Sequence, residues 1–518
     1  MKSKDSVRHA AVIAVGAGMY ALFFALGRTM ETQGTCAGAG RLFLPALPVF
    51  ALLLALLLRA GDIRLRGRAK PFSAKRTFAL LLLVYAGFYI IVFPGTFAYD
   101  TFHQLGQIKN GAYSMHHPLL HTLLLRLCLI PYRFLGTFEV TAVLYCVTQM
   151  LVMAGLFTLT CASLSRTCGD GAARASAWFF ALYPLHMCFA SHMTKDVIFG
   201  GACALMLALA VEAAVRPACE GRRLVLLTLT STLALMMRKN MLYAVAVWLV
   251  LLLPGLRRKR VRHLALCTLA ALALSTAGQA VLKTALHAEN GDFGEMLSVP
   301  IQQVSRVSVK AYDELSAEEL ALLDAAIMNQ AYLNYDPFIS DAVKDGLRSE
   351  VLRENPRAYL ELYGSLAKRY PQEYFDALIE LISPYLYPYT HYRFSRDYIE
   401  MRCKDENPFE RYYSTPLEQN ETFAPVREWL ERHVYRTGAE DIPVLNVIMN
   451  LGVISWAMLF LVLREAYRGD WMRFAIGLLP VLLFGTYLLG PVMQGRYIYP
   501  FVCCLPVLAS REQTTKAL

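Results

Sequence analysis

One carboxylate and several histidines follow directly after an apolar stretch of this chain. The apolar run 77–93 is long enough, with its flanks, to cross a bilayer, and a Pro-Gly pair after it ends the helix. A carboxylate just outside the lipid stays ionised and can take a proton from a lipid-borne substrate. The segment therefore points to chemistry at a membrane surface. Its candidate residues are Asp100, His103, His116 and His117.

A second set of polar residues lies at the ends of later apolar runs. Lysine and arginine neutralise phosphate groups, so we expect Lys195, Arg238 and Arg496 to hold a phosphate while Asp100 acts as general base. Asp196 and Tyr497 adjoin two of these cations and complete the predicted substrate-binding set.

Composition sets the class of the protein. Hydrophobic residues make up 56% of the chain and charged residues only 18%, with a mean hydropathy of +0.39. These values predict a polytopic membrane protein. The net charge of +11 does not indicate nucleic acid, because the basic residues fall between apolar runs, where they act as topology signals.

The apolar runs predict an all-α fold with about twelve transmembrane helices. The basic loops 59–76 and 257–262 are expected on the cytoplasmic side. A crossing at 118–135 would invert every later loop, so we interpret that stretch as a re-entrant or interfacial helix. All candidate residues then lie on the outer side. The predicted spans are 9–27, 42–59, 77–93, 138–163, 175–191, 197–215, 224–237, 241–256, 264–283, 443–463, 473–490 and 497–510.

Three parts of the chain are expected. Residues 1–283 form an N-terminal membrane module with a first outer loop at 94–137, and 443–518 form the C-terminal membrane helices. Residues 284–442 predict a small helical extracytoplasmic domain, with a capping box at Ser316 to Glu319 and a helical pattern over 356–382.

The cysteines do not indicate a zinc site or a disulfide framework. Most of the twelve lie inside predicted spans and none form a CxxC pair, whereas Cys36 and Cys403 fall in predicted outer loops. Nucleotide-binding loops and soluble-hydrolase motifs are absent from the sequence.

The order of four short patches resembles the GT-C superfamily of membrane glycosyltransferases, and more closely a bacterial branch of GT-C-like multipass proteins. The patches are Tyr99-Asp100, His116-His117-Pro118, Thr194-Lys195-Asp196 and Gly495-Arg496-Tyr497.

This resemblance implies transfer of a sugar from a polyprenyl-phosphate donor to a glycan, lipid or protein acceptor of the cell envelope. It also implies that Asp100 is the general base or the ligand of a divalent cation such as Mg²⁺ or Mn²⁺. Many members of the superfamily have two adjacent acidic residues at this place, whereas Tyr99 and Thr101 flank Asp100 here. Direct displacement with a single base would invert the anomeric configuration.

Simpler interpretations stand beside these. Asp100 could cap a short helix, Lys195 and Asp196 could pair with one another, and Arg496 could reach to lipid headgroups. The two histidines before Pro118 could form a turn, and Arg238 could mark only a tight turn between spans. A transporter or flippase for a lipid-linked or anionic solute is the alternative function, and an inactive lipid-binding relative is a third.

Overall fold

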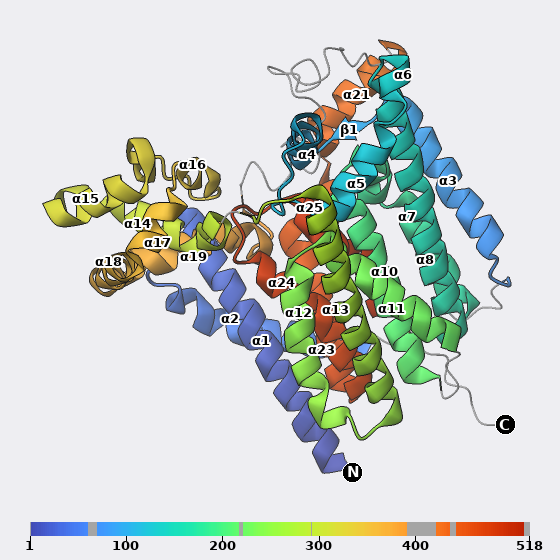
Figure 1. The fold of residues 1–518 in the computed structure, drawn as a ribbon. Coiled ribbons are helices and arrows are strands. Elements are labelled where there is room, and N and C mark those ends of the chain that lie inside the picture. The colour runs from blue at the N-terminus through green and yellow to red at the C-terminus, as the bar shows by residue number, and fades with distance from the viewer. Residues whose placement is uncertain are drawn as a thin grey trace.

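The computed structural model describes residues 2–60, 70–216, 221–291, 293–390, 421–435 and 442–511. These residues form an all-α fold, which confirms the predicted class. Long helices pack into a bundle, and a group of shorter helices from α14 to α19 lies to one side of it (Figure 1). Within the described ranges, the only strands are two short ones that pair with each other.

Six helices are long and apolar enough to cross a membrane, which is compatible with a membrane-embedded protein. Three apolar helices are shorter: α12 (Asn240–Leu252, extended by the turn η1 over Leu253–Gly255), α24 (Trp471–Tyr487) and α25 (Gly495–Ala509). The predicted number of twelve spans is therefore not confirmed. The six long helices are α1 (Lys2–Gln33), α2 (Gly40–Ala60), α3 (Ala74–Ile91), α7 (Glu139–Cys168), α10 (Lys195–Val215) and α13 (Lys259–Leu286).

Two predicted spans are wrong as single helices. The run 175–191 is divided into α8 (Asp170–Leu182) and α9 (Pro184–Ala190), because Pro184 has no N–H to continue the hydrogen bonds of the first helix. The run 443–463 is divided into α22 (Pro443–Ile448) and α23 (Leu451–Arg468). Here Asn450 caps the second helix by accepting a hydrogen bond from the Val453 N–H. The remaining apolar helix, α11, covers Gly221–Met237.

The stretch 118–135 also differs from the single helix that we predicted. It contains α5 (Leu119–Cys128) and a one-turn helix, α6 (Tyr132–Leu135). The 10 residues of α5 extend only about 15 Å, roughly half of a hydrocarbon core. This length agrees with a segment that does not cross the membrane.

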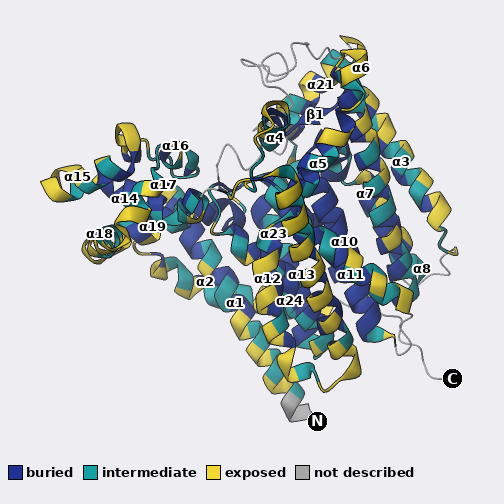
Figure 2. Cartoon of the chain, in the orientation of Figure 1, coloured by how far each residue is buried: buried dark blue, intermediate teal, exposed yellow. Residues whose placement is uncertain are grey.

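Helix α10 is the centre of the bundle. It packs against α7, α11 and α25, and all of its apolar window is buried inside the protein. Its dark colour in Figure 2 contrasts with the outer helices, which have yellow, exposed faces. The exposed side chains on these faces are largely apolar, as with Leu83 on α3 and Val281 on α13.

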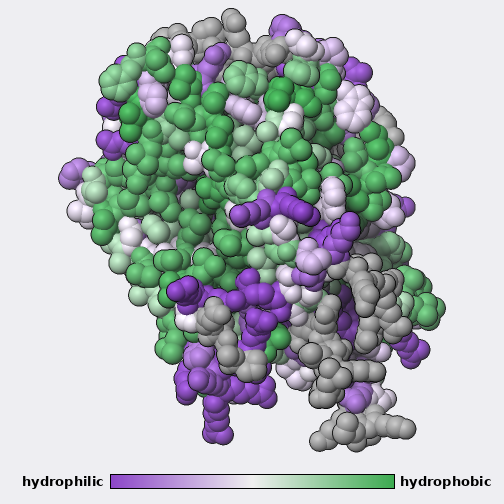
Figure 3. Space-filling view, turned by 90° about the vertical axis from the view of Figure 1, so that its right-hand side faces the viewer, coloured by the Kyte–Doolittle hydropathy of each residue, from purple (hydrophilic) through white to green (hydrophobic). Residues whose placement is uncertain are grey.

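The two ends of the bundle differ. Helix α4, the strand β1 and the N-terminal end of α10 lie at the upper end in Figure 1, which we call the site end. The chain's N-terminus and the loop from α12 to α13 lie at the lower end, which we call the opposite end. Hydrophobic side chains cover most of the face in Figure 3, and hydrophilic ones gather towards its lower part. Part of the basic loop 59–76, residues 61–69, lies outside the described residues.

The shorter helices after residue 292 have a hydrophobic core of their own, around Val307, Tyr332 and Leu366. The predicted capping box is confirmed at the start of α15, where Ser316 and Glu319 bond reciprocally. The predicted pattern 356–382 is two helices, broken before Pro371. The elements are η2 (Phe293–Leu297), α14 (Ser298–Lys310), η3 (Tyr312–Glu314), α15 (Ala317–Ala326), η4 (Met328–Leu333), α16 (Asp341–Lys344), α17 (Ser349–Glu354), α18 (Pro356–Arg369) and α19 (Pro371–Leu386).

An arginine joins this group to the N-terminal helices. Arg306 pairs with Glu373 at 2.8 Å and also with Glu380, and its Nη2 donates to the Gly34 carbonyl at 2.9 Å. The backbone N–H of Cys36 donates to Asp376 at 2.7 Å in the same region. The group is therefore fixed to the loop between α1 and α2.

The later part of 284–442 lies elsewhere. Helix α21 (Ala424–Leu430), flanked by η6 (Glu421–Phe423) and the π-helical turn η7 (Glu431–Tyr435), is near α6 and β1 in Figure 1. Arg427 donates there to the Ile91 carbonyl at 3.3 Å. Cys403 lies outside the described residues, whereas the ten cysteines within them are buried and not joined in disulfides.

Candidate functional site

Two short parallel strands set the geometry of the site. β1 (Thr96–Phe97) pairs with β2 (His192–Met193), with Thr96 opposite His192. Helix α4 (Tyr99–Asn110) begins two residues after β1, and α10 begins two residues after β2. The first turns of the two helices are therefore held side by side, and Thr101 adds a 2.5 Å hydrogen bond to the Met193 carbonyl.

A glycine allows the close approach before β1. Gly95 has a φ of +131°, and a Cβ there would lie 2.7 Å from Cys146 Sγ and 3.2 Å from the Ser191 carbonyl oxygen. Only glycine combines this backbone conformation with such contacts at little cost. The Pro-Gly pair thus both follows the end of α3, as predicted, and seats the segment that carries Asp100.

Asp100 is the meeting point of two cations. Lys195 Nζ donates to Asp100 Oδ2 at 2.5 Å, and Arg496 Nη1 lies 3.0 Å from the same oxygen. His117 Nδ1 is 4.0 Å from that oxygen and 3.4 Å from Lys195 Nζ. Among the described residues, every close polar contact of the Asp100 side chain reaches Oδ2. The structure thus brings together four predicted residues from four separate segments.

The interpretation of Asp100 as a helix cap is wrong. The N-cap of α4 is Ala98, and Asp100 lies inside the first turn. Its side chain is 16% exposed, compared with 9% for Lys195 and 14% for Arg496. The carboxylate is therefore surrounded by protein but still reachable.

The protonation states follow from this setting. Burial by itself would raise the pKa of Asp100, but Arg496 and Lys195 outweigh it and hold that pKa well below its usual value. Burial, with Lys195 next, lowers the pKa of His117 to about 2. At physiological pH the site accordingly holds an ionised Asp100 and a neutral His117.

Asp196 does not pair with its sequence neighbour, Lys195. Its carboxylate pairs with Arg238, whose Nε donates to Oδ1 at 2.6 Å, and it accepts from Thr194 Oγ1 at 3.1 Å. The interpretation in which Lys195 and Asp196 pair with each other is wrong, since Lys195 turns to Asp100 instead. Arg238, in the turn between α11 and α12, therefore does more than mark that turn.

Tyr497 links the two arginines. The Arg238 guanidinium carbon lies 4.6 Å from the centre of the Tyr497 ring, and that of Arg496 lies 5.0 Å from it. Arg496 Nη2 also donates to the Tyr497 hydroxyl at 3.1 Å. Arg496 is thus directed to Asp100 and Tyr497 and not to lipid headgroups. Three cations share two carboxylates here, which leaves one positive charge uncompensated.

The other two predicted histidines lie around the cluster. The His103 ring centre is 4.7 Å from that of Tyr99 and 6.0 Å from that of His117. His116 stands edge-on to His117 at 4.5 Å, with its Nδ1 4.0 Å from Glu295 on η2. Both lie beside His117, and neither makes an ion pair to Asp100 among the described residues.

A buried hydrogen-bond network supports the site, and sequence reasoning missed most of it. His121 Nδ1 lies 2.7 Å from Gln104 Oε1, and His121 Nε2 lies 2.6 Å from the Tyr145 hydroxyl. Gln104 also donates to Thr122 Oγ1 at 2.7 Å, and Tyr145 donates to the Thr194 carbonyl at 3.4 Å. The network connects α4, α5, α7 and the start of α10.

A helical spacing could have revealed one of its members. Gln104 follows Asp100 by four residues within α4, so the two share a helix face. His121 also follows His117 by four residues, but His117 precedes α5. Tyr145 lies within an apolar span and carries no comparable signal.

The helix ends add to the positive character of the site. Asp100, Lys195 and Arg496 lie in the first turns of α4, α10 and α25, so three helix N-termini meet here. Each N-terminus carries a partial positive charge. The arrangement favours a bound anion.

The donor set does not suit a divalent metal ion. Mg²⁺ and Mn²⁺ need several oxygen or nitrogen ligands. Asp100 Oδ2 instead faces two cations, and within the residues that the structure describes no three His, Cys, Asp or Glu side chains are placed to hold a metal ion together. A metal-dependent step therefore does not fit these residues.

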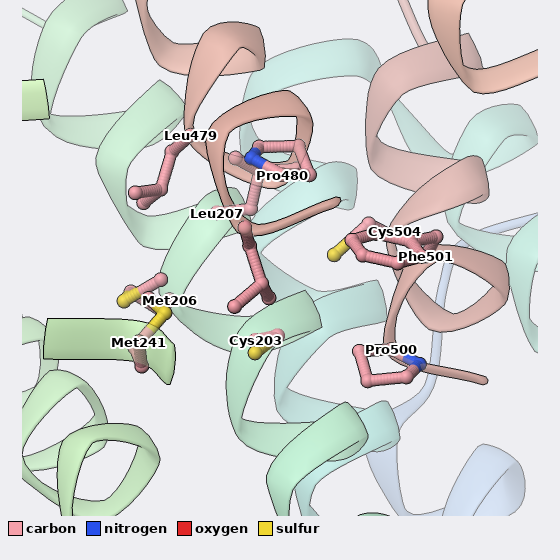
Figure 4. Close-up of a pocket in the computed structure, with 10 residues that line it drawn as sticks. Cys203, Met206, Leu207, Met241, Leu479, Pro480, Pro500, Phe501 and Cys504 are labelled. Carbon is pink, nitrogen blue, oxygen red and sulfur yellow. The ribbon is translucent and has the colours of Figure 1, made fainter. Parts of the chain in front are cut away.

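Deeper in the bundle, a small cavity lies between α10, α12, α24 and α25. Figure 4 shows Cys203 and Leu207 of α10, Pro480 of α24 and Phe501 of α25 around this space. All ten lining residues are uncharged. This cavity offers no acid, base or counter-ion for chemistry.

A family model described as a family of unknown function, DUF6020, matches residues 109–516 of the chain. No curated protein and no solved structure matches the chain.

Proposed function

The chain belongs to the DUF6020 family, and we propose that it is a membrane glycosyltransferase that takes a sugar from a polyprenyl-phosphate-linked donor. One observation carries the proposal. A single reachable carboxylate, Asp100, lies against Lys195 and Arg496 in a cluster with a surplus of positive charge.

These groups match the two demands of the reaction. An acceptor hydroxyl must lose a proton as its oxygen attacks the anomeric carbon, while the bond from that carbon to the phosphate oxygen breaks. Asp100 accepts the proton, and Lys195 and Arg496 stabilise the charge that grows on the departing lipid phosphate. The products are the glycosylated acceptor and the polyprenyl phosphate, with the anomeric configuration inverted.

Donor binding would also prepare the base. In the ligand-free state the two cations keep the pKa of Asp100 well below its usual value, which makes it a weak base. A donor phosphate competes for the same cations and weakens their hold on Asp100. The pKa of Asp100 then rises, so the carboxylate becomes a better proton acceptor only when the donor is present.

The proposal includes a topology. The site end faces the extracytoplasmic side, and the chain crosses the membrane about twelve times, with the shorter and broken helices counted among the spans. The exposed cations Arg257 and Arg258 at the opposite end support this orientation, because cytoplasmic loops are enriched in basic residues. The acceptor would then be a glycan, lipid or protein of the cell envelope.

The distribution of charge favours an enzyme over a transporter. Transporters bind their solutes near the middle of the membrane, with polar groups on broken helices. Along α10 the acidic and basic residues lie at the two ends, and the cavity beside its middle has an uncharged lining.

The proposal is tested with purified protein in liposomes that contain labelled polyprenyl-phosphate sugars and an envelope acceptor extract. The wild type should form a labelled product with the inverted anomer. Asp100→Asn should lower turnover by about 10²–10⁴-fold. The amide cannot take the proton of the acceptor hydroxyl, although its oxygen still accepts hydrogen bonds.

The matched control is Asp170→Asn, since Asp170 lies away from the site and bonds to Ser165. The control should keep wild-type turnover. Product with retained configuration, or full turnover in Asp100→Asn, would contradict the proposed mechanism.

A further inference from the structure

The loop between α24 and α25, residues 488–494, determines where Arg496 lies. Its last residue, Gln494, is the N-cap of α25, and the Gln494 side chain makes no capping hydrogen bond among the described residues. Arg496 follows two residues later, in the first turn of the helix. The position of its guanidinium group therefore depends on what holds the backbone of this loop.

Ser340, at the start of α16, holds the middle of the loop. Its backbone N–H donates to the Pro491 carbonyl at 2.9 Å, and its Oγ donates to the same oxygen at 3.2 Å. Ile339 and Val492 form an isolated antiparallel bridge beside these bonds. Ser340 is the N-cap of α16, where a serine hydroxyl usually accepts a hydrogen bond from its own helix. Here the hydroxyl makes no such bond and reaches Pro491 instead.

Tyr385, near the end of α19, holds the start of α25 itself. Its hydroxyl donates to the Gln494 carbonyl at 2.8 Å. The same carbonyl accepts the backbone N–H of Tyr497 at 3.1 Å, which is the first hydrogen bond of the helix. The Tyr385 ring is buried, with its centre 5.7 Å from that of Phe484 on α24. The contact therefore fixes the N-terminal end of α25 directly before Arg496.

The same group of helices also reaches the histidines, but less firmly. Lys344, four residues after Ser340, pairs with Glu295 at 2.9 Å, and Glu295 lies 4.0 Å from His116 Nδ1. The side chains of Glu295 and His116 are 34% and 39% exposed, and ion pairs at such positions contribute little. The stronger link from this group to the site is thus the one to the loop before Arg496.

From these contacts we infer that Ser340 and Tyr385 are positioning residues for Arg496. They hold the backbone from Pro491 to Gln494, so that Arg496 Nη1 stays 3.0 Å from Asp100 Oδ2. The shorter helices α14 to α19 thereby take part in the site without supplying a charged group to the pair. This role rests on the proposed function for the reaction that Arg496 serves, whereas the positioning itself can be measured without a substrate.

A double-mutant cycle on the purified full-length protein in detergent measures the positioning. Tyr385→Phe should lower the melting temperature of the wild type, because it removes one hydrogen bond and loosens the pair of Arg496 with Asp100. In the Arg496→Met background that pair is already absent, so Tyr385→Phe should lower the melting temperature by about half as much or less. An equal loss in both backgrounds would mean that the bond is only structural and would overturn the inference.

Matched controls come from the same group of helices. The buried Tyr374 donates its hydroxyl to the Tyr363 carbonyl at 3.0 Å, so Tyr374→Phe should cost the same with and without Arg496. Ser340→Ala is the second test variant and should show the same coupling to Arg496→Met as Tyr385→Phe does. Its control is Ser308→Ala, which removes a buried hydroxyl that bonds within α14. Coupling of similar size in the controls would also count against a specific role.

Sugar transfer gives a second readout. Tyr385→Phe should lower kcat about tenfold, because a small displacement of Arg496 weakens its contact with the departing phosphate. A displaced Arg496 also depresses the pKa of Asp100 less, so the acid limb of the pH–rate profile should move to higher pH. An unshifted limb with unchanged kcat would overturn the inference. If the wild type transfers no sugar, the proposed function fails, and the coupling of melting temperatures still decides whether Ser340 and Tyr385 position Arg496.

Discussion

The charged clusters at the two ends of α10 differ in how exposed their carboxylates are and in how many of the carboxylate oxygens are bound. At the site end, Asp100 is 16% exposed, and its close contacts converge on one oxygen. At the opposite end, Glu212 is 1% exposed and both its oxygens are bound: Arg166 reaches Oε1 at 2.7 Å and Oε2 at 2.8 Å. Ser163 donates to Oε2 at 2.8 Å, and Arg223 pairs with the same carboxylate.

The comparison separates a structural ion pair from a candidate reactive one. Lys195 and Glu212 are roughly 25 Å apart along one fully buried helix, so burial of the backbone does not distinguish them. The two clusters differ in the exposure of the carboxylate and in whether one of its oxygens is free to accept a proton. Glu212 has no oxygen left for a substrate, whereas Asp100 has one.

The largest expected effect concerns the structural end. Glu212→Gln leaves Arg166 and Arg223 without their counter-charge, and breaking a buried pair in this way costs about 3–5 kcal/mol. The melting temperature in detergent should fall clearly, while activity per folded molecule stays near that of the wild type. Arg174→Gln, an exposed cation on α8, serves as control. Loss of activity without loss of stability would remove the distinction between the two ends.

At the site end, Lys195→Met should lower turnover by about 10²–10³-fold, the usual loss for one donor to a developing oxyanion. The same change removes a cation that depresses the pKa of Asp100, so that pKa rises. Since the base works when ionised, the acid limb of the pH–rate profile should move to higher pH. Lys75→Met at the opposite end should change neither quantity, and an unshifted acid limb in Lys195→Met would argue against coupling to Asp100.

His117 predicts a pH dependence of stability. Burial lowers its folded pKa to about 2, below the unfolded value of about 6.5, so the unfolded chain binds more protons between these values. Stability should therefore be full above about pH 6.5 and fall below it, by about 1.4 kcal/mol per pH unit for this group. His117→Gln should flatten the slope between pH 5 and 6.5, and the exposed-site variant His287→Asn should not. Equal slopes in all three proteins would show that His117 titrates freely.

Much of this arrangement could be predicted from the sequence, for identifiable reasons. Long apolar helices were predictable from hydropathy. The proximity of Asp100, Lys195 and Arg496 was predictable because the sequence placed all three on the same side of the membrane. The breaks before Pro184 and Leu451 were missed because the apolar pattern continues across them.

The pairing of adjacent residues could not be predicted. Lys195 and Asp196 are neighbours in sequence, but successive positions on a helix point about 100° apart, so each meets a different partner. The hydrogen bond from Tyr145 to His121 depends on which helices pack together, and that is decided by contacts distant in sequence.

The smallest expected effect concerns the supporting network. Tyr145→Phe removes the hydrogen bond to His121, which should cost about 1 kcal/mol of stability. Tyr85→Phe is a matched control, because its buried hydroxyl donates to the Phe180 carbonyl away from the site. Both variants should lose similar stability, but only Tyr145→Phe should lower kcat. An equal effect on kcat would mean that the network has no positioning role.

The most direct test of the account is the side of the membrane on which Asp100 lies. Its neighbour Tyr99 is 59% exposed, and Arg258 is exposed at the opposite end. Cysteine reporters Tyr99→Cys and Arg258→Cys can be made in a protein in which Cys219 and Cys403 are changed to serine and the ten buried cysteines are kept. Intact cells are then treated with a membrane-impermeant maleimide, and the protein without either reporter gives the background labelling. The account predicts that Tyr99→Cys is labelled at once and Arg258→Cys only after permeabilisation. The reverse pattern would place Asp100 on the cytosolic side and contradict the proposed reaction at the outer surface.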